Sequence, residues 1–519
     1  MQNPIGDSVR WHGLYSSEKL AIVSPQGSIT YSELWNRAIR VADGLRSIGV
    51  APGDRVALMM ANGAPYIELY VAAALLGVAV VPINFRFLAK EVEYLINHSG
   101  AKALVYDSIA APTVREARSR FTSEVLRYVA LDGDRLETAD KLTSHYEQLI
   151  ADSRVLDWAM DVADPEACYF QGYTAGTTGF PKGCVNPHRE FADCLRRMGL
   201  VYGITDTDIE LVAAPLFHEA PALFALTQIM RGGCLVIPKD SSPETLMTAI
   251  QNHKVTWTFM VPTMWTSFVT CEAMSRYDLS SLRIGISGGS ALQTSTKQAI
   301  LEKMSATGLN EFYGGTEVGL VTNLSPEDQS RKVRSVGRPV PDMYVELRSE
   351  EGQPVKTGEI GEIHVGGATL IREYYKNPEA TQSARSSGGF FSLGDMGRLD
   401  DEGYLYIVDR KKDMIISGGE NIYPNDIEDA LYQYPGVQMV AVVGAPDNLW
   451  GEIVVAVVVS EPGVKLDEQL LIAHCKENLS PFKVPKRIDF RAELPLSAFG
   501  KILRREVKDT YWEGHTARV

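Results

Sequence analysis

The chain has 519 residues, of which 45% are hydrophobic and 22% charged, a composition that excludes a disordered or fibrous protein. At roughly 100 to 200 residues per domain, this length predicts several packed units. Asp and Glu (65) outnumber Lys and Arg (51), and the formal net charge of −14 disfavours nucleic acid and anionic membrane as partners.

Cysteine usage and the N-terminal sequence indicate a cytoplasmic protein. The six cysteines form no C-x-x-C pair and have no histidine at zinc-finger spacing, so we expect reduced structural thiols. No secretory signal is visible in the first residues. The longest apolar run, 69–81, is shorter than the ~20 residues of a membrane helix, and we expect a buried helix that ends near Gly77 and a core strand after it.

Through the first two-thirds of the chain, apolar runs bounded by Gly or Pro alternate with segments of helical period. This alternation predicts an α/β fold of stacked layers with largely parallel sheets. The predicted strands are 56–60, 78–83, 103–106, 235–237, 256–261 and 284–287.

From residue 336 the pattern changes to short alternating segments between Gly-containing turns, which predicts a β-rich subdomain. Its predicted strands are 344–347, 361–365 and 404–408. The charge cluster 409–413 then indicates an exposed linker and a domain boundary.

Beyond the cluster, helical and apolar segments predict a small α+β unit. The predicted helices are 425–434 and 467–478, and the predicted strands are 437–444 and 453–459. We therefore expect an N-terminal domain over 1–410, with subdomains of about 1–165, 166–335 and 336–410, and a C-terminal domain over 411–519.

A glycine- and threonine-rich loop, Tyr173-Thr174-Ala175-Gly176-Thr177-Thr178-Gly179-Phe180-Pro181-Lys182-Gly183, follows a strand-like segment. Glycines allow close backbone approach to an anion, hydroxyls donate hydrogen bonds and Lys182 supplies positive charge, so the loop suits a polyphosphate. It is not a Walker loop, because the Gly-Lys-Ser/Thr ending is missing.

This loop resembles the phosphate-binding signature of the adenylate-forming superfamily, which contains acyl-CoA synthetases, adenylation domains of peptide synthetases, and luciferases. Further matches follow in the family's order: Phe217-His218, Gly288-Gly289, Tyr313-Gly314-Gly315-Thr316-Glu317, Leu393-Gly394-Asp395, the charge cluster 409–413, Gly418-Gly419-Glu420-Asn421-Ile422, Pro495-Leu496-Ser497 and Gly500-Lys501. The resemblance spans nearly the whole chain. Within the superfamily, the chain resembles the acyl-CoA synthetase branch. It implies a large N-terminal domain and a small, mobile C-terminal domain.

The resemblance implies binding of ATP with Mg²⁺. The loop residues Thr174, Gly176, Thr177, Thr178, Gly179 and Lys182 would hold the β and γ phosphates, Thr316 the α-phosphate and Glu317 the Mg²⁺. Adenine would lie between Gly288, Gly289, Glu311, Phe312, Tyr313 and Gly314, and the ribose would contact Asp395 and Arg410. Alone, a Thr-Glu pair is more typical of a helix N-cap and Asp395 of a turn, and Tyr313 could be a core aromatic.

The same resemblance assigns catalytic roles. Lys501 would bridge the acyl carboxylate and the α-phosphate, and His218 would stand beside the acyl pocket. Lys412 matches the hinge about which the C-terminal domain rotates, after which Gly418, Gly419 and Glu420 would line the tunnel for the pantetheine arm of CoA.

The implied activity is that of an ATP-dependent acid:CoA ligase, with a small-molecule carboxylic acid, ATP and CoA as its partners. One alternative is an adenylation enzyme that loads a carrier-protein phosphopantetheine; the chain end eighteen residues after Lys501 favours free CoA. The second alternative is a nucleotide-binding or scaffold protein that keeps the fold but has no catalytic activity. A homodimer is a further expectation.

Glu219 follows His218 and is unexpected beside an apolar acyl chain. If it faces the pocket, a polar or cationic substrate group becomes the natural partner; if it faces solvent, it carries no information. The large apolar residues Phe224, Met264 and Trp265 are predicted to belong to the general core.

Overall fold

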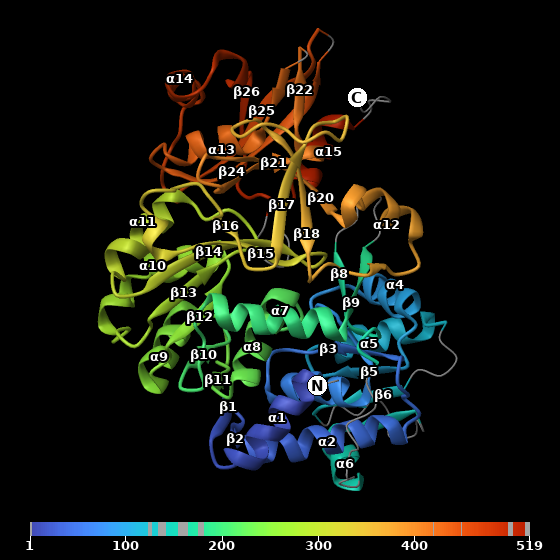
Figure 1. The fold of residues 1–519 in the computed structure, drawn as a ribbon. Coiled ribbons are helices and arrows are strands. Elements are labelled where there is room, and N and C mark those ends of the chain that lie inside the picture. Colours follow the sequence, from blue (N-terminus) through green and yellow to red (C-terminus); the bar gives the residue numbers. More distant parts are fainter. Residues whose placement is uncertain are drawn as a thin grey trace.

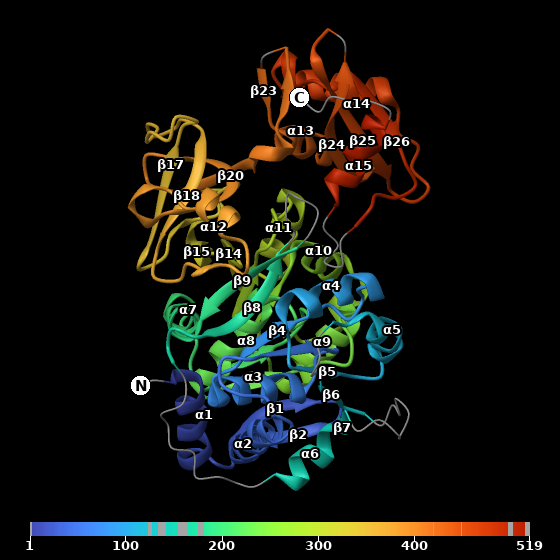
Figure 2. The same cartoon turned by 90° about the vertical axis from the view of Figure 1, so that its right-hand side faces the viewer.

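The computed structural model describes residues 3–122, 127–132, 142–153, 164–174, 181–418, 420–447, 449–496 and 502–513. Figure 1 shows two large sheets with their helices in the lower body, a β-rich part above them, and a small domain at the top that contains the C-terminal residues. Figure 2 shows the same small domain standing over one end of the larger body.

An eight-stranded sheet, counted over the described residues, has the strand order β19-β9-β8-β4-β3-β5-β6-β7. The pairings from β8 through β4, β3, β5 and β6 to β7 are parallel, whereas β9 pairs antiparallel with both β8 and β19. The strands are β3 (Arg55–Met59), β4 (Ala79–Pro82), β5 (Ala103–Tyr106), β6 (Arg127–Ala130), β7 (Thr143–His145), β8 (Cys168–Thr174), β9 (Lys182–Pro187) and β19 (Glu373–Tyr374). The helices in this stretch are α2 (Tyr31–Ser47), α3 (Ala64–Leu76), α4 (Ala89–Ser99), α5 (Ala111–Ala117), η1 (Arg118–Arg120) and α6 (Tyr146–Asp152).

Local sequence explains how the helices of this sheet begin and end. Thr30 and Glu33 form a reciprocal capping box at the start of α2. Helix α3 is apolar on all sides and therefore buried, and it ends at Gly77, whose φ of 69° is left-handed and favours glycine. The predicted buried helix with a core strand after it is confirmed.

A second sheet has nine strands among the described residues, in the order β16-β15-β14-β13-β12-β10-β11-β1-β2. Its strands are β1 (Leu20–Ser24), β2 (Gly27–Thr30), β10 (Ile209–Leu211), β11 (Cys234–Val236), β12 (Trp257–Met260), β13 (Ile284–Ser287), β14 (Gly308–Gly315), β15 (Gly319–Leu324) and β16 (Arg338–Pro339). Its helical segments are α1 (Pro4–Tyr15), α7 (His188–Val201), α8 (Glu219–Arg231), α9 (Pro243–His253), α10 (Pro262–Thr270), η2 (Glu272–Arg276), α11 (Thr294–Lys303) and η3 (Pro326–Asp328). The N-terminal strand β1 pairs in parallel with β11, so the first strand of the chain enters the second sheet.

The β-rich part is an antiparallel sheet of β17 (Met343–Arg348), β18 (Gly361–Gly367), β20 (Phe391–Leu399) and β21 (Leu405–Arg410). It also contains α12 (Pro378–Ala384) and η4 (Ser387–Gly389). The C-terminal unit then contains η5 (Lys411–Asp413), β22 (Ile415–Ser417), β23 (Glu420–Ile422), α13 (Pro424–Tyr432), β24 (Val437–Asp447), β25 (Gly451–Ser460), α14 (Glu468–Asn478), η6 (Pro481–Lys483), β26 (Arg487–Phe490) and α15 (Arg504–Trp512).

The fold class predicted from the sequence is confirmed. Every predicted strand overlaps an observed one, and both large sheets are mostly parallel. Membership of the two sheets does not follow the order of the chain, because β1 and β2 belong to the second sheet, whereas β3 to β9 belong to the first. The subdomain limits near 165, 335 and 410 therefore stay a prediction.

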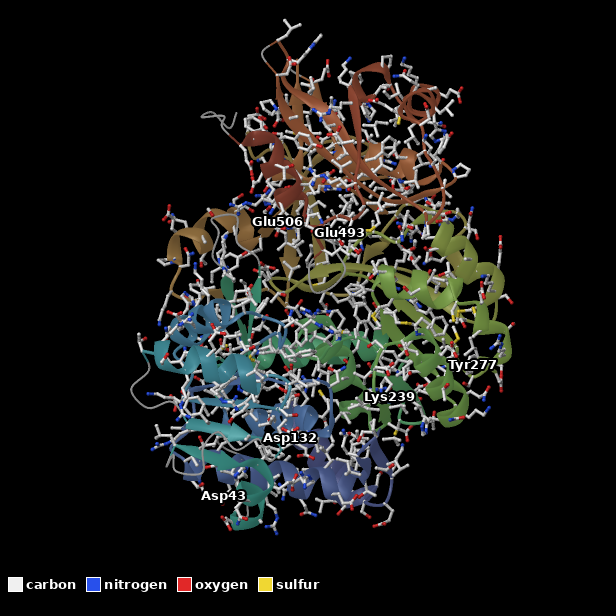
Figure 3. The ribbon with its side chains drawn as sticks, turned by 180° about the vertical axis from the view of Figure 1, so that it is seen from behind. Asp43, Asp132, Lys239, Tyr277, Glu493 and Glu506 are labelled. Carbon is white, nitrogen blue, oxygen red and sulfur yellow. The ribbon has the colours of Figure 1, made fainter. Side chains whose placement is uncertain are left out.

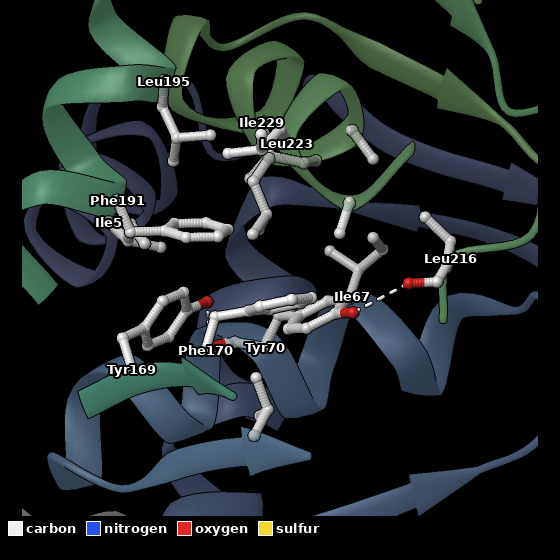
Figure 4. Packing of buried hydrophobic residues seen from close by; sticks show 14 of the residues in the cluster. Ile5, Ile67, Tyr70, Tyr169, Phe170, Phe191, Leu195, Leu216, Leu223 and Ile229 are labelled. Carbon is white, nitrogen blue, oxygen red and sulfur yellow. Dashed lines mark hydrogen bonds between the residues drawn. The ribbon is translucent and has the colours of Figure 1, made fainter. Parts of the chain in front are cut away.

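An aromatic core joins the two large sheets where α3, α7, α8 and β8 meet (Figure 4). The rings of Phe170 and Phe191 stack at 5.4 Å. The hydroxyl of Tyr169 donates to the Tyr70 carbonyl at 3.0 Å, and the hydroxyl of Tyr70 donates to the Leu216 carbonyl at 2.8 Å. These bonds satisfy buried polar atoms and fix the chain just before α8.

Contacts across the hinge hold the C-terminal unit in one orientation. Arg334, which precedes β16, forms ion pairs with Asp426 and Asp429 of α13. Figure 3 shows Glu493 and Glu506 on the side of this unit that faces the rest of the chain. Among the described residues, no helix is both long and apolar enough to cross a bilayer.

Candidate active site

Two motifs that are 143 residues apart meet at the carboxyl ends of β8 and β14. The hydroxyl of Thr174, the last residue of β8, donates to Glu317 Oε1 at 3.1 Å. The hydroxyl of Tyr374 donates to the same oxygen at 3.0 Å. Because both hydrogen bonds fall on Oε1, the second carboxylate oxygen of Glu317 can face a cation. Thr316 lies beside β8, where a Cβ added to Gly172 would come within 3.1 Å of its methyl group.

Lys182 opens β9 directly opposite Thr174 in the β8–β9 register. Its Nζ lies 4.7 Å from the centre of the Tyr374 ring, so one tyrosine contacts both the lysine and the carboxylate of the site. Residues 175–180 lie outside the described residues, and the roles expected for Gly176, Thr177, Thr178 and Gly179 stay predictions.

Side chains behind β8 and β9 anchor the base of the loop. The hydroxyl of Tyr94 donates to the Pro181 carbonyl at 2.9 Å. The hydroxyl of Tyr173 lies 2.8 Å from His98 Nδ1. Burial raises the pKa of Tyr173, so its hydroxyl stays protonated at neutral pH. Both ends of the loop are therefore fixed by hydrogen bonds to α4.

The glycines expected around adenine lie where side chains would collide. A Cβ on Gly288 would lie 2.3 Å from the Phe312 ring, and a Cβ on Gly314 would lie 2.1 Å from the Gly319 carbonyl oxygen. Gly289, with φ of 84°, follows in the turn after β13. These glycines let the turn after β13 approach β14 closely. The structure thus brings Gly288 against Phe312, whereas Gly314 packs against Gly319 of the neighbouring strand.

Glu311 turns its side chain away from these glycines. Its carboxylate pairs with the buried Lys297 Nζ at 2.5 Å. Burial raises the pKa of Glu311 and the lysine opposes that rise. Any contact of Glu311 with adenine would therefore use its backbone.

The residues expected to hold the ribose form one hydrogen-bonded group. Asp395 of β20 lies opposite Arg410 of β21 in the sheet register. Its Oδ2 accepts a hydrogen bond from the Tyr313 hydroxyl at 2.8 Å, and its Oδ1 lies 3.2 Å from Arg410 Nε. Burial, and then the Asp395 charge, raise the pKa of Tyr313. Tyr313 thus joins the residues expected around adenine to the carboxylate expected to hold the ribose.

His218 is the N-cap residue of α8, and it precedes Glu219, which lies near Thr316. The segment before it is held by Asn62, which donates to the Ala214 carbonyl at 2.9 Å and accepts from the Leu216 amide at 2.8 Å. Burial, with a smaller effect of the Arg86 charge, lowers the pKa of His218 to about 2. The imidazole is therefore neutral at physiological pH.

Glu219 is the first residue of α8, and its carboxyl is turned inward. Burial raises its pKa well above the ordinary value, and a hydrogen bond from the Thr316 side chain opposes that rise. Its Oε2 is shielded from solvent, so the solvent-facing orientation considered from the sequence is excluded, and its place beside the acyl group stays a prediction. By contrast, Phe224 and Trp265 are fully buried and Met264 packs against the same clusters, as predicted for core residues.

Most of the hinge cluster is exposed, as the sequence predicts: Arg410, Lys411 and Lys412 are exposed. Asp409 is the exception, because it is buried and accepts a hydrogen bond from Arg504 Nη1 at 3.1 Å. Burial raises the pKa of Asp409 to about 6, and the Arg504 charge opposes this. Lys412 is exposed; partial desolvation lowers its pKa, while the Asp413 charge opposes that effect.

Gly418 and Glu420, two of the residues expected to line the CoA tunnel, do not meet the other motifs in this orientation. Figures 1 and 2 show β22 and β23 toward the outer end of the C-terminal unit. Gly418 has a φ of 60°, and a Cβ there would lie 2.6 Å from the Trp450 ring. Glu420 is exposed at the start of β23. Gly419 and Lys501 lie outside the described residues.

Sequence reasoning did not find Tyr374 or Arg504. Tyr374 is 57 residues from Glu317 and belongs to no motif, so no local signal indicates it. Arg504 comes three residues after Lys501, which belongs to a recognised motif. This short distance in sequence could have indicated that Arg504 lies near the hinge.

The donor set fits Mg²⁺ shared with a nucleotide. Among the described residues, no group of three or more His, Cys, Asp or Glu side chains is placed to hold a metal by itself. Mg²⁺ in nucleotide sites usually takes one or two carboxylates and completes its shell with phosphate and water oxygens. Glu317, next to the phosphate-loop strand, can be that carboxylate.

Comparison with known families agrees with this geometry. Residues 10–375 match the family of AMP-binding enzymes, and residues 426–501 match the C-terminal domain of AMP-binding enzymes. The first match alone covers more than half of the chain. The chain therefore belongs to the AMP-binding enzyme family, the adenylate-forming superfamily.

Individual relatives narrow the position within that family. A feruloyl-CoA synthase of Amycolatopsis sp is 36% identical over 488 residues, covering 93% of this chain and 94% of that protein. A long-chain-fatty-acid–CoA ligase of Mycobacterium tuberculosis is 33% identical over 514 residues, covering 98% of each. The amide bond synthetase McbA from Marinactinospora thermotolerans has a TM-score of 0.87 at 27% identity, covering 98% of this chain and all of that one. The chain lies in the acyl-CoA synthetase branch.

Proposed function

We propose that this chain is an ATP-dependent acid:CoA ligase. A carboxylate attacks the α-phosphorus of ATP and gives acyl-AMP and pyrophosphate; the CoA thiol then attacks the acyl carbonyl and gives acyl-CoA and AMP. The observation that carries the proposal is the hydrogen bond from Thr174 to Glu317, which brings the phosphate-loop strand to the residue expected to hold Mg²⁺.

The first step requires charge neutralisation on the attacked phosphorus and on pyrophosphate. Lys182, with Thr174, Gly176, Thr177, Thr178 and Gly179, would hold the β and γ phosphates, and Thr316 the α-phosphate. Bound through Glu317, Mg²⁺ would supply further positive charge to the phosphates. Asp395 and Arg410 would hold the ribose, and the walls formed by Gly288 and Phe312 would hold adenine.

Two residues are assigned to the acyl side. Lys501 would bridge the acyl carboxylate and the α-phosphate, and the neutral imidazole of His218 would border the acyl pocket without adding charge. Replacement of Lys501 by Ala should therefore suppress adenylation much more than thioester formation from supplied acyl-adenylate. Equal loss of both steps would contradict this role.

The second step requires access for a thiol. We assign residues 1–410 to the N-terminal domain and 411–519 to a mobile C-terminal domain that turns near Lys412. After rotation, Gly418, Gly419 and Glu420 would line the pantetheine tunnel. The outward position of β23 supports this, because the same hairpin must move to reach the acyl-adenylate.

Two other acceptors are open to test. A carrier-protein phosphopantetheine has the same thiol as CoA, and the structural similarity to an amide bond synthetase favours an amine as another acceptor. We place the enzyme in the cytoplasm, expect a homodimer, and regard fatty acid metabolism as one setting, because a relative is named for long-chain fatty acids.

The deciding experiment measures pyrophosphate release over a panel of carboxylic acids, with and without CoA and Mg²⁺, and identifies the acyl product. Acyl-CoA formed in a Mg²⁺-dependent reaction supports the ligase. Release without acceleration by CoA, together with product on a carrier protein or amine, would replace CoA as the acceptor. No release with any acid would revive a silent nucleotide-binding scaffold.

A further inference from the structure

Glu219 is an acidic side chain that the adenylation chemistry does not use. It occupies the first position of α8, where the positive end of the helix dipole tolerates a carboxylate. A surface carboxylate there would point to solvent or cap the helix. Instead, no side-chain capping bond forms at this helix start, and the Thr316 side chain hydrogen-bonds with the Glu219 carboxyl.

The inward carboxyl lacks a partner on one of its two oxygens. Glu219 Oε2 is shielded from solvent and accepts no hydrogen bond from the described residues. The surrounding groups that feel its charge are the Tyr70 hydroxyl and the thiols of Cys184 and Cys194, which are themselves buried. A shielded polar oxygen without a donor is costly, and such groups usually receive a partner from a ligand or water.

The local charge favours a cation as that partner. Glu317 is the charged neighbour that acts on Glu219, and it is acidic as well. None of the described Lys and Arg side chains forms an ion pair with Glu219. A positively charged group that donates to Oε2 would supply the missing partner and stabilise the ionised form of Glu219 against its burial.

The position of Glu219 limits where that group lies on the substrate. In the proposed reaction Thr316 contacts the α-phosphate, which the acid attacks through its carboxylate. Because the Glu219 carboxyl lies beside the Thr316 side chain, we expect it within roughly 6 Å of the reacting atoms, about two hydrogen-bond lengths. An amino group on the second to fourth carbon of a carboxylic acid can span that distance.

Resting on the proposed ligase function, we propose that Glu219 is a specificity residue that selects carboxylic acids bearing a protonated amino group near the carboxylate. The ammonium N–H donates to the shielded Oε2, and its charge neutralises the Glu219 carboxylate. Such an acid enters as a zwitterion, so its net charge does not oppose entry into an acidic site.

Matched substrate pairs test this proposal. Each pair replaces an ammonium group by a methyl group of similar size: 3-aminopropanoate with butanoate, and 4-aminobutanoate with pentanoate. We measure kcat/KM from pyrophosphate release with CoA present. The wild-type enzyme should prefer the amino acid of at least one pair on the order of 30-fold, the effect of leaving a buried charge without its partner.

Two variants distinguish a role of Glu219 in substrate selection from a general effect on the structure. Glu219→Gln keeps the shape but removes the charge, and should move the ratio of kcat/KM within a pair toward one, chiefly through KM for the amino acid. Glu244→Gln, at an exposed position in the first turn of α9, should keep the wild-type ratio. If Glu219→Gln does not fold, the wild-type ratio alone decides.

Several outcomes would overturn the inference. One is a wild-type ratio at or below one while unsubstituted acids release pyrophosphate, which leaves the ligase proposal standing. Another is a preference for 4-hydroxybutanoate over 4-aminobutanoate, which would make Glu219 a site for neutral donors. A third is a higher Mg²⁺ requirement of Glu219→Gln with pentanoate, which would make Glu219 a metal ligand. No release with any acid would instead overturn the ligase function together with this inference.

Discussion

Removal of one hydroxyl group tests how the site holds Glu317. Tyr374→Phe deletes the donor that reaches Glu317 Oε1 at 3.0 Å, but keeps the ring whose centre lies 4.7 Å from Lys182 Nζ. Thr174 remains as the other donor to the same oxygen. The variant therefore loosens the carboxylate while leaving the phosphate lysine in place.

The size of the effect follows from the loss of one of two hydrogen bonds to a buried charged group. Such bonds contribute about 1.5 to 3 kcal/mol, so we expect a roughly 10- to 100-fold fall in kcat/KM for ATP. Because Glu317 is the expected Mg²⁺ ligand, the Mg²⁺ concentration for half-maximal activity should rise as well. The thermal midpoint without ligands should change little, because the phenyl ring of the variant still fills the site.

The assay is pyrophosphate release at varied ATP and Mg²⁺, with two reference variants. Tyr374→Leu loses both the hydroxyl and the ring and should fall further than Tyr374→Phe. Tyr375→Phe removes a hydroxyl from the neighbouring half-buried tyrosine, which packs against Arg55 instead, and should behave as wild type. Equal kinetics of Tyr374→Phe and wild type within twofold would refute the reasoning.

Three further predictions follow from burial. Arg504→Ala leaves buried carboxylates unpaired and should lower the free energy of unfolding by about 3 to 5 kcal/mol in urea titrations, whereas the exposed Arg505→Ala should cost under ~1 kcal/mol. Burial raises the pKa of Glu210, whose Oε2 has no hydrogen-bond partner among the described residues, so its folded form prefers the proton. Stability should therefore fall as pH rises above the unfolded value of about 4.3, and Glu210→Gln should flatten this slope. Gly288→Ala, with its Cβ 2.3 Å from the Phe312 ring, should raise KM for ATP on the order of tenfold; an unchanged KM would contradict the adenine wall.

Local sequence patterns were sufficient to place six central strands of the two large sheets and the helices α13 and α14, but not the edge strands or α15. Apolar runs between Gly and Pro are short-range signals, and the strands 103–106 and 284–287 are observed with the predicted bounds. The order of the strands was not predictable in this way, because the pairing of β1 with β11 depends on packing between segments more than 200 residues apart.

The residues of the candidate site likewise divide into those that sequence motifs predict and those that depend on tertiary contacts. Motif spacing identified Thr174, Glu317 and Asp395, because each belongs to a short pattern with a known resemblance. Tyr374 and the buried state of Asp409 depend on tertiary contacts with Glu317 and Arg504, and no local pattern encodes them. The direction of Glu219 was open for the same reason, since a helix-start residue can point either way.

The entry of β1 and β2 into the second sheet has a consequence for synthesis on the ribosome. β1 (Leu20–Ser24) must wait for β11 (Cys234–Val236), some 210 residues later, before its parallel partner exists. At 5 to 20 residues per second, that wait lasts roughly 10 to 40 s. During this time the buried side chains of Ala21 and Ile22 have no sheet to cover them, so the first 30 residues are a candidate chaperone-binding segment of the nascent chain.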